Sequence, residues 1–129
     1  MKLLLDTQVW LWSLVSPERL TPAVASLLSD AANDLYLSAA SCWEIAIKYQ
    51  LGKLPLPEDP EDFIPPRLLR DGIQGLPVSL QHASRVARLP GHHRDLFDRL
   101  LVSQGQIEKL ALVSSDPIFS RYDVELIRC

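Results

Sequence analysis

The 129-residue chain is poor in cysteine, has no long hydrophobic run and carries no excess of basic residues. Its two cysteines, Cys42 and Cys129, lie far apart and show no metal-binding spacing, so two reduced thiols are expected. The apolar stretches at residues 3–5 and 9–15 are too short to cross a bilayer, and Asp6 interrupts any secretory pattern. We therefore expect a protein that is not attached to a membrane and that acts in the cytoplasm.

The charge balance does not exclude a nucleic-acid partner. With 13 basic and 16 acidic residues the formal net charge is −3, whereas proteins that simply bind nucleic acid are usually basic. Carboxylates that held two divalent cations would reverse this balance. A hydrophobic content of 47% and a charged content of 22% are typical of a folded protein, and the length predicts a single domain over residues 1–129.

Short apolar segments alternate with helical ones along the chain. We predict strands at residues 3–5, 35–38, 73–78, 110–114 and 124–127, and helices at residues 8–15, 21–32, 41–51, 61–70, 79–89 and 95–109. Pro65 and Pro66 should kink or break the fourth of these helices. Because strands that alternate with helices form right-handed βαβ units, the sequence predicts an α/β fold with a central, mostly parallel sheet.

Four carboxylates fall at comparable places in this pattern. Asp6 ends the first strand, and Glu44 is expected in the first turn of the helix after the second strand. Asp98 lies in the first turn of the helix before the fourth strand, and Asp116 follows that strand. In a parallel sheet the carboxyl ends of the strands share one edge, where open α/β sheets bind ligands. The four acids are therefore expected to converge there, provided that the helix of Asp98 begins near that edge.

Three of these acids also have a local explanation. Glu44 fits a capping box with Ser41 as the N-cap. Asp98 lies one turn after the expected N-cap Asp95, where acids favour the helix dipole, and Asp116 precedes a proline as a cap often does. The acid that ends the first strand has no such role, which favours a functional one.

Taken together, the four acids indicate a cation site. Carboxylates crowded at one edge repel one another, and the pKa of at least one is raised unless a cation neutralises them. Oxygen ligands without cysteine favour Mg²⁺ or Mn²⁺. Such cations activate a water molecule and stabilise the leaving oxygen of a phosphodiester. The pattern therefore points to hydrolysis of phosphodiester bonds.

Several short motifs occur in a characteristic order: Leu-Leu-Asp-Thr at 4–7, the segments 38–48 and 51–54, His-Arg-Asp-Leu-Phe-Asp-Arg at 93–99, and Leu-Val-Ser-Ser-Asp at 112–116. With these motifs the chain resembles the PIN domain family, and within it the ribonuclease toxins of type II toxin–antitoxin modules (the VapC group). The resemblance implies a three-layer α/β/α fold and a Mg²⁺- or Mn²⁺-dependent endoribonuclease that acts on RNA. It also implies a small cognate antitoxin as partner, and a homodimer.

The same resemblance implies roles for individual residues. The acids that would be both catalytic and metal-binding are Asp6, Glu44, Asp98 and Asp116, with Asp6 and Asp98 as the principal ligands. Thr7 and Ser114 offer hydroxyl groups to the same edge. Asp95 is a candidate supporting acid, although capping of its helix is the stronger expectation.

Basic side chains are candidates for contacts with RNA phosphates. These candidates are Lys48, Arg94, Arg99 and Arg121. Each has a simpler explanation as a solvated surface residue, and Lys48 also forms an i, i+4 pair with Glu44.

Aromatic side chains and the two adjacent histidines are weaker candidates. Trp10, Trp12 and Trp43 could stack on bases, but packing or an interface is the favoured role for all three. His92 and His93 are not expected to be metal ligands, because adjacent side chains in a loop point apart.

The chain departs from the pattern of the VapC group at four positions. Gln8 stands where the group commonly has His, Leu96 replaces a common Pro, and Ser114 replaces a common Thr. Gly105 falls inside a predicted helix where Ala is usual, which should cost about 1 kcal/mol. None of these changes removes a carboxylate, so activity is still expected, while Gln8 leaves the choice of substrate open.

Two alternatives remain at this stage. A catalytically silent PIN-fold module that binds RNA or protein would retain the same acids. A phosphoacceptor receiver domain has a similar length and alternation, but it needs an acid pair at the first strand and a lysine after a late strand. Here Asp6 is followed by Thr7 and Gln8, and residues 114–116 contain no lysine.

Overall fold

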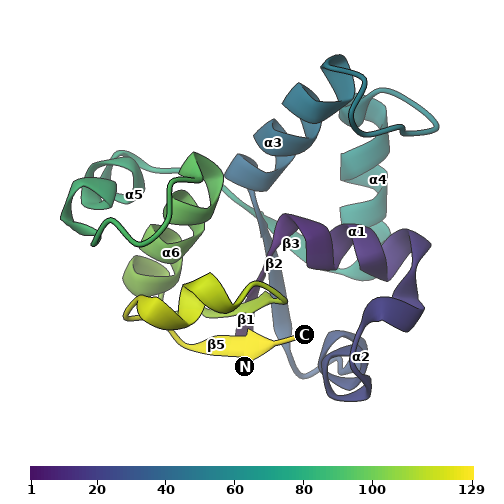
Figure 1. Cartoon of the computed structure of the whole chain (residues 1–129). Helices are drawn as coiled ribbons and strands as arrows, with labels where there is room; N and C mark the ends of the chain where they lie inside the picture. Colours follow the sequence, from purple (N-terminus) through teal and green to yellow (C-terminus); the bar gives the residue numbers. More distant parts are fainter.

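Five parallel strands form the centre of the protein, as a computed structural model describes it over residues 1–129. They are β1 (Lys2–Leu5), β2 (Asp34–Ser38), β3 (Ile73–Leu76), β4 (Ala111–Ser114) and β5 (Leu126–Arg128). Their order in the sheet is β3-β2-β1-β4-β5, and every neighbouring pair is parallel (Figure 1). The prediction of a mostly parallel α/β sheet is confirmed. The order differs from the 2-1-3-4-5 order of receiver-like folds.

Helical segments connect the strands. The α-helices are α1 (Thr7–Val15), α2 (Pro22–Ser29), α3 (Ala39–Gln50), α4 (Pro60–Asp71), α5 (Leu80–Arg85) and α6 (Leu96–Glu108). Three short 3₁₀ segments are η1 (Pro17–Arg19), η2 (Val86–Arg88) and η3 (Pro117–Arg121). The predicted helix over 79–89 is therefore α5 followed by η2. None of the helices combines the length and the apolar character that crossing a bilayer requires.

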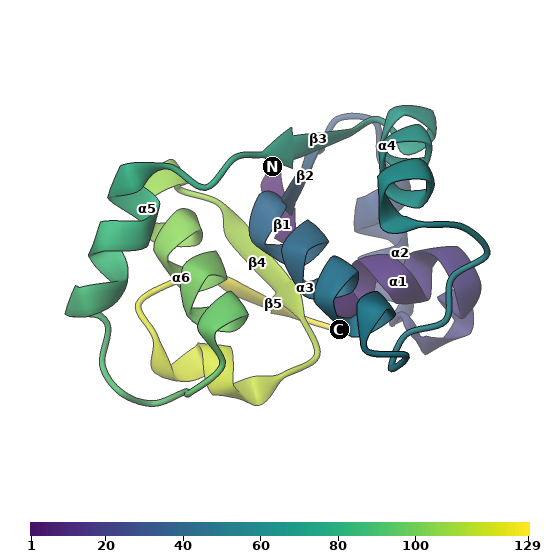
Figure 2. The ribbon, with the colours of Figure 1, turned by 90° about the horizontal axis from the view of Figure 1, so that it is seen from above.

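The sheet lies between two helical layers, which confirms the three-layer α/β/α arrangement. Along β1, Leu3 and Leu5 belong to a buried cluster shared with α1, α2 and α4, whereas Leu4 belongs to one shared with α6 and η3. This alternation follows from the two-residue period of a strand. Figure 2 shows α5 and α6 on one side of the sheet and α1, α2 and α4 on the other.

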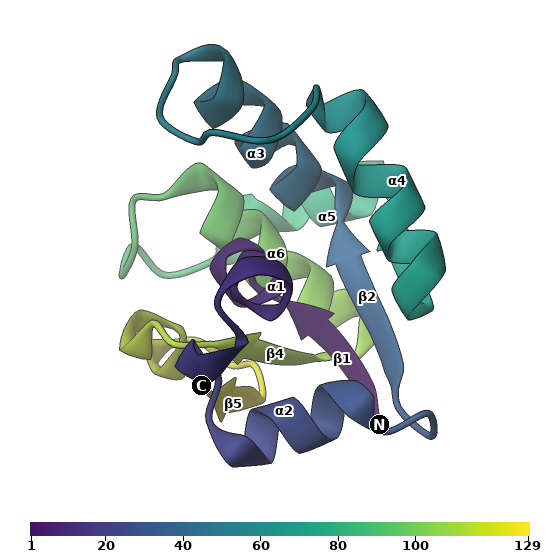
Figure 3. The same ribbon diagram turned by 90° about the vertical axis from the view of Figure 1, so that its right-hand side faces the viewer.

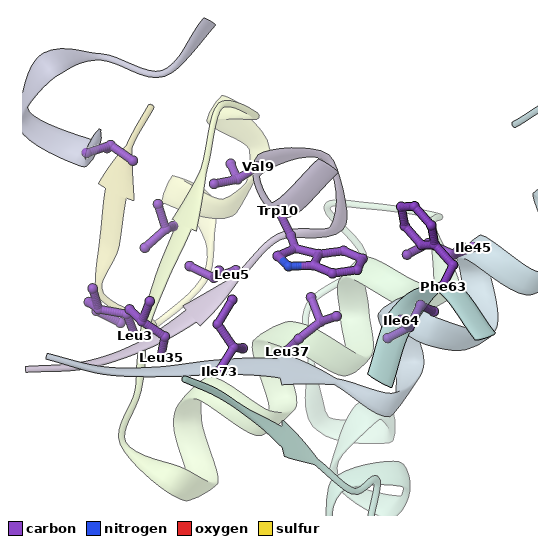
Figure 4. Close-up of a cluster of buried hydrophobic side chains, with 13 residues drawn as sticks. Leu3, Leu5, Val9, Trp10, Leu35, Leu37, Ile45, Phe63, Ile64 and Ile73 are labelled. Carbon is purple, nitrogen blue, oxygen red and sulfur yellow. The ribbon is translucent and has the colours of Figure 1, made fainter. Parts of the chain in front are cut away.

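Trp10 is the largest fully buried side chain. It lies between the sheet and α4, where its ring meets Phe63 edge to face with the centroids 6.1 Å apart (Figure 4). Burial of an aromatic side chain in this arrangement is a strong local source of stability. Trp10 is therefore a core residue and is not accessible for base stacking.

Pro65 and Pro66 were expected to kink or break a helix. The expectation of a break is wrong. A single α-helix, α4, runs from Pro60 to Asp71 through both prolines. Each proline removes one backbone donor, but both rings lie on the exposed side of α4. Phe63 and Ile64 are buried against the sheet. Packing of this apolar face holds the helix together across the missing hydrogen bonds.

Candidate active site

The carboxyl ends of β1 and β4 place two of the acids side by side. Leu5 pairs with Val113 in the sheet, and the Asp6 N–H donates to the Val113 carbonyl at 2.9 Å. The hydroxyl of Ser114 donates to Asp6 Oδ2 at 2.6 Å and accepts from the N–H of Asp116 at 3.1 Å. Ser114 thus connects the acid after β1 to the acid after β4.

Glu44 reaches the same edge from α3, which follows β2 directly (Figure 3). The predicted capping box is wrong, because α3 begins at Ala39 and its N-cap is Ser38 rather than Ser41. Glu44 therefore lies in the second turn, where it is buried. Its carboxylate accepts from Thr7 Oγ1 at 2.8 Å and pairs with Lys48 Nζ at 2.7 Å.

Asp98 comes from the first turn of α6. Asp95 caps this helix and accepts from the N–H groups of Phe97 and Asp98 at 2.9 and 3.1 Å, so its expected capping role is confirmed. The Asp98 side chain is 16% exposed, and its Oδ2 lies 2.7 Å from Nε2 of His93. The helix start is thus what aims Asp98 at the strand ends.

His93 is the site residue that reasoning from the sequence missed. The two histidine rings do diverge: His92 packs on Tyr122, whereas His93 faces Phe119 and contacts Asp98. Contrary to the expectation from the sequence, this divergence does not keep the His93 ring out of the site. The signal in the sequence was the position of His93 two residues before a helix cap, from which the chain can fold back on the first turn.

The acids divide into two overlapping groups that share Asp98. Asp6, Glu44 and Asp98 line a cavity of about 290 Å³, together with Thr7, Gln8, Leu11, Ile45, Lys48, Lys53, Leu54 and Asp95. Asp116 does not line this cavity, but single donor atoms of His93, Asp98 and Asp116 lie within 4.8 Å of one another. The four predicted acids therefore gather at one edge, with Asp98 between the two groups.

Burial, and to a lesser extent charge repulsion, raises the pKa of two of these acids. For Asp6, burial is the main cause; the charges of Glu44 and Asp116 add to it, and the hydrogen bond from Ser114 opposes it. For Asp98, burial is the main cause of a rise in pKa to about 7, and the charges of Asp6 and Asp95 contribute to it. The site thus carries negative charge that the protein itself does not fully neutralise.

The donor set fits a divalent cation that prefers oxygen. The converging groups are four carboxylates with one imidazole beside them and no thiolate, which suits Mg²⁺ or Mn²⁺ better than Zn²⁺. The raised pKa values of Asp6 and Asp98 indicate the same fit, since a bound cation would stabilise the ionised carboxylates that burial and repulsion disfavour.

The predicted RNA-contacting residues are not equivalent. The guanidinium of Arg99 donates to backbone carbonyls of the preceding loop, which leaves fewer of its N–H groups for phosphates. Lys48 is paired with Glu44 but keeps a half-exposed side chain, and Arg94 and Arg121 are exposed. Lys53, which was not predicted, also lines the acidic cavity.

The remaining tryptophans lie at the surface to different degrees. Trp12 is partly buried and lies 5.7 Å from the guanidinium of Arg19. Trp43 is 59% exposed, and its ring meets that of Phe97 edge to face at 5.3 Å.

The fold and the site define a PIN domain. The family model described as the PIN domain matches residues 3–125, and the chain belongs to this family.

Individual relatives are similar over different extents. Over 63 residues the chain is 46% identical to Ribonuclease VapC16 of Mycobacterium tuberculosis, and the match covers 49% of this chain and 43% of that protein. The chain thus spans less than half the length of the curated relative that it matches.

Solved structures match over nearly the whole chain. VapBC2 from Rickettsia felis, bound to a promoter DNA fragment, superposes with a TM-score of 0.74 at 18% identity, over 99% of this chain and 98% of that one. DNA-bound VapBC from Salmonella typhimurium gives 0.72 at 16% identity, over 99% and 98% of the two chains. At these identities the structures establish a shared fold.

Proposed function

We propose that this protein is a Mg²⁺- or Mn²⁺-dependent endoribonuclease. The observation that carries the proposal is the convergence of four carboxylates, from four separate segments, at the carboxyl edge of a parallel sheet. Membership of the PIN domain family and the similarity to a ribonuclease over 63 residues support RNA as the substrate.

Asp6, Glu44, Asp98 and Asp116 would hold the metal. A bound divalent cation supplies a water of lowered pKa and stabilises charge on the phosphodiester. The protein's own groups prepare this site. Ser114 fixes the Asp6 carboxylate from one side, and Thr7 fixes Glu44 from another.

Lysines at the rim of the cavity would help to bind the substrate. Lys48 and Lys53 both line the cavity that contains Asp6, Glu44 and Asp98. The hydrogen bond to Glu44 raises the pKa of Lys48, so its ammonium group stays charged at neutral pH. A phosphate of RNA that entered this cavity would meet positive charge beside the acids.

We also propose that the protein is the toxin of a toxin–antitoxin pair, with a small antitoxin as partner, and that it forms a homodimer. Two of the structural neighbours are VapBC complexes bound to DNA. Co-expression with the product of an adjacent short reading frame, followed by co-purification and a test for loss of nuclease activity, checks the partner. Size-exclusion chromatography with light scattering checks the dimer.

Cleavage of RNA by the purified protein tests the central proposal. We expect cleavage in Mg²⁺ or Mn²⁺, none in EDTA, and a loss of at least about 100-fold in rate for Asp6→Asn or Asp98→Asn, because a neutral amide is a poor ligand for these ions. Asp62→Asn on the exposed face of α4 is the matched control and should keep full activity.

Two results would contradict the mechanism. Cleavage that survives in EDTA, or that persists in both site variants, removes the cation from the reaction. RNA binding without cleavage under any metal condition would instead identify the catalytically silent PIN module.

A further inference from the structure

The side chain of Arg99 lies beneath the loop that precedes α6. Its Nη1 donates to the carbonyls of Pro90 at 2.9 Å and His93 at 3.4 Å. Its Nη2 donates to the carbonyls of Val86 at 3.1 Å and Leu89 at 3.4 Å. One guanidinium thus joins four carbonyl groups of a single segment to the first turns of α6.

Only arginine has the donor geometry for this arrangement. A guanidinium carries five N–H donors in a rigid plane, whereas the lysine ammonium has three on a single flexible point. Arg99 Nη1 also donates to the hydroxyl of Tyr122, the C-cap residue of η3, at 3.4 Å. Arg99 is therefore one of several groups that attach the segment 86–93 to the body of the protein, together with the buried Leu89 and the rings of His92 and His93.

This segment ends at His93, whose ring is fixed on two sides. It meets the fully buried Phe119 edge to face, with the centroids 6.4 Å apart. Its Nε2 lies 2.7 Å from Oδ2 of Asp98. When Asp98 is ionised its carboxylate can only accept, so Nε2–H is then the donor. The second carboxylate oxygen of Asp98 stays free of this bond.

We propose that Arg99 and His93 are positioning residues of the cation site. Arg99 holds the segment 86–93 on α6. His93, fixed in this way, holds the Asp98 carboxylate by one oxygen and leaves the other for the metal. The inference depends on the proposed function in taking Asp98 as a metal ligand. Hydrogen bonds of this kind to metal-binding carboxylates typically change metal affinity by about 10–100-fold.

Mn²⁺ titration of the purified protein without RNA tests the role of His93. We expect His93→Leu to weaken Mn²⁺ binding by about 10–100-fold. His93→Gln, whose amide can donate in place of Nε2–H, should restore affinity to within about threefold of the natural protein. His92→Leu, on the adjacent ring that packs against Tyr122, is the matched control and should leave affinity unchanged.

A double-mutant cycle tests whether Arg99 acts through His93. Arg99→Met and Arg99→Lys should each weaken Mn²⁺ binding when the His93 side chain is present. In the His93→Leu background the same changes should have little further effect, since the coupling passes through His93. Arg88→Met is the control, because Arg88 is an exposed arginine of the same segment. Circular dichroism confirms that each variant is folded.

Two further measurements remain possible even when the Arg99 variants do not fold. Long-range ¹⁵N–¹H spectra of the metal-free natural protein at pH 8 should show His93 as the Nε2–H tautomer. Pulsed electron paramagnetic resonance of the Mn²⁺-loaded protein should show the same nitrogen couplings in the natural protein and in His93→Leu. No coupling that is present in the natural protein should be lost in the variant. Such a coupling would make His93 a direct ligand and overturn the positioning role.

The remaining outcomes also decide the inference. Unchanged Mn²⁺ affinity in His93→Leu overturns it, and equal effects of Arg99→Met in both backgrounds overturn the part played by Arg99. If the protein binds Mn²⁺ but does not cleave RNA, the ribonuclease proposal is refuted. The Mn²⁺ titrations of the variants then still decide whether His93 and Arg99 position the site. A natural protein that binds no Mn²⁺ refutes both.

Discussion

Asp98 is the most strongly perturbed carboxyl group in the candidate site. Burial, Asp6 and Asp95 raise its pKa to about 7, and the hydrogen bond from His93 opposes this only in part. A group of this kind is poorly accommodated as a bare anion and well suited to a cation, which would remove the repulsion. The chemistry of the site and the stability of the metal-free protein are therefore coupled at one residue.

We expect the metal-free protein to become more stable as the pH falls from 8 to 5. The folded protein binds the Asp98 proton up to a pKa of about 7, whereas the unfolded chain loses it near the ordinary value of 3.8. Between these values the folded state holds more protons, so the free energy of unfolding decreases as pH rises. A gain of about 1–3 kcal/mol at pH 5 is expected, and urea denaturation in EDTA measures it.

Asp98→Asn provides the control for this pH dependence. The variant should be more stable than the natural protein at pH 8 and should show a flatter profile. The profile should not be entirely flat, because the raised pKa of Asp6 acts in the same direction. An unchanged slope in the variant would show that Asp98 is not the group that titrates.

At the scale of elements, Gly105 shows why α6 departs from a good helical sequence. A methyl group at this position would lie 2.8 Å from Val124 Cγ2 and 3.3 Å from the Leu110 carbonyl oxygen. The N–H of Leu110 also donates to the Gly105 carbonyl at 3.0 Å as the chain leaves the helix. The close approach of these segments explains a glycine that propensity alone disfavours.

We therefore expect Gly105→Ala to destabilise the protein, although alanine favours a helix. Overpacking typically costs about 1–3 kcal/mol, and the helical preference returns about 1 kcal/mol of it. Urea denaturation should show a net loss, and the loss should shrink in a Val124→Ala background. Gly75→Ala is a suitable comparison, because no atom lies within 4 Å of the added carbon there. A more stable Gly105→Ala would contradict the packing argument.

The position at which α3 begins also depends on how the elements pack. A pattern of Ser41 and Glu44 satisfies the capping box, yet the helix begins at Ala39 after Ser38. Ser38 belongs both to β2, where it pairs with Leu76, and to the cap, where its hydroxyl accepts from Ala40. The pairing of β2 with β3 therefore sets the start of α3. Local helix propensity does not contain this information. This shift leaves Glu44 free for the site.

For the molecule as a whole, the cost of gathering the acids should be recovered when a metal binds. We expect Mn²⁺ or Mg²⁺ to raise the midpoint of thermal unfolding in proportion to the logarithm of its concentration, because ligands that bind only the folded state stabilise it. At a concentration of about 100 times the dissociation constant the gain is about 2.7 kcal/mol. Differential scanning fluorimetry measures the shift.

Asp6→Asn and Asp98→Asn should abolish most of this stabilisation, whereas Asp62→Asn should retain it. Ca²⁺ at equal concentration provides a check on selectivity, since it prefers more ligands and a more flexible site than Mg²⁺. Equal stabilisation of all variants would locate the ion elsewhere on the protein.

The class of fold and the set of four acids could be predicted from the sequence alone. Apolar segments of strand length, alternating with helices, define a parallel sheet, and acids after such strands meet at its carboxyl edge because every strand runs the same way. The caps at Asp95 and Asp116 could also be predicted, since a cap depends on residues within three positions of it.

The partners of these side chains could not be predicted, because they depend on how distant segments pack. Ser114 meets Asp6 across 108 positions of sequence, and Thr7 meets Glu44 across 37. The position of Arg99 against its loop and the orientation of His93 toward the site depend on contacts with segments such as η3. The periodicity of apolar residues indicates which face of a helix or strand is buried. Which side chain a given residue contacts is determined by the packing of distant segments.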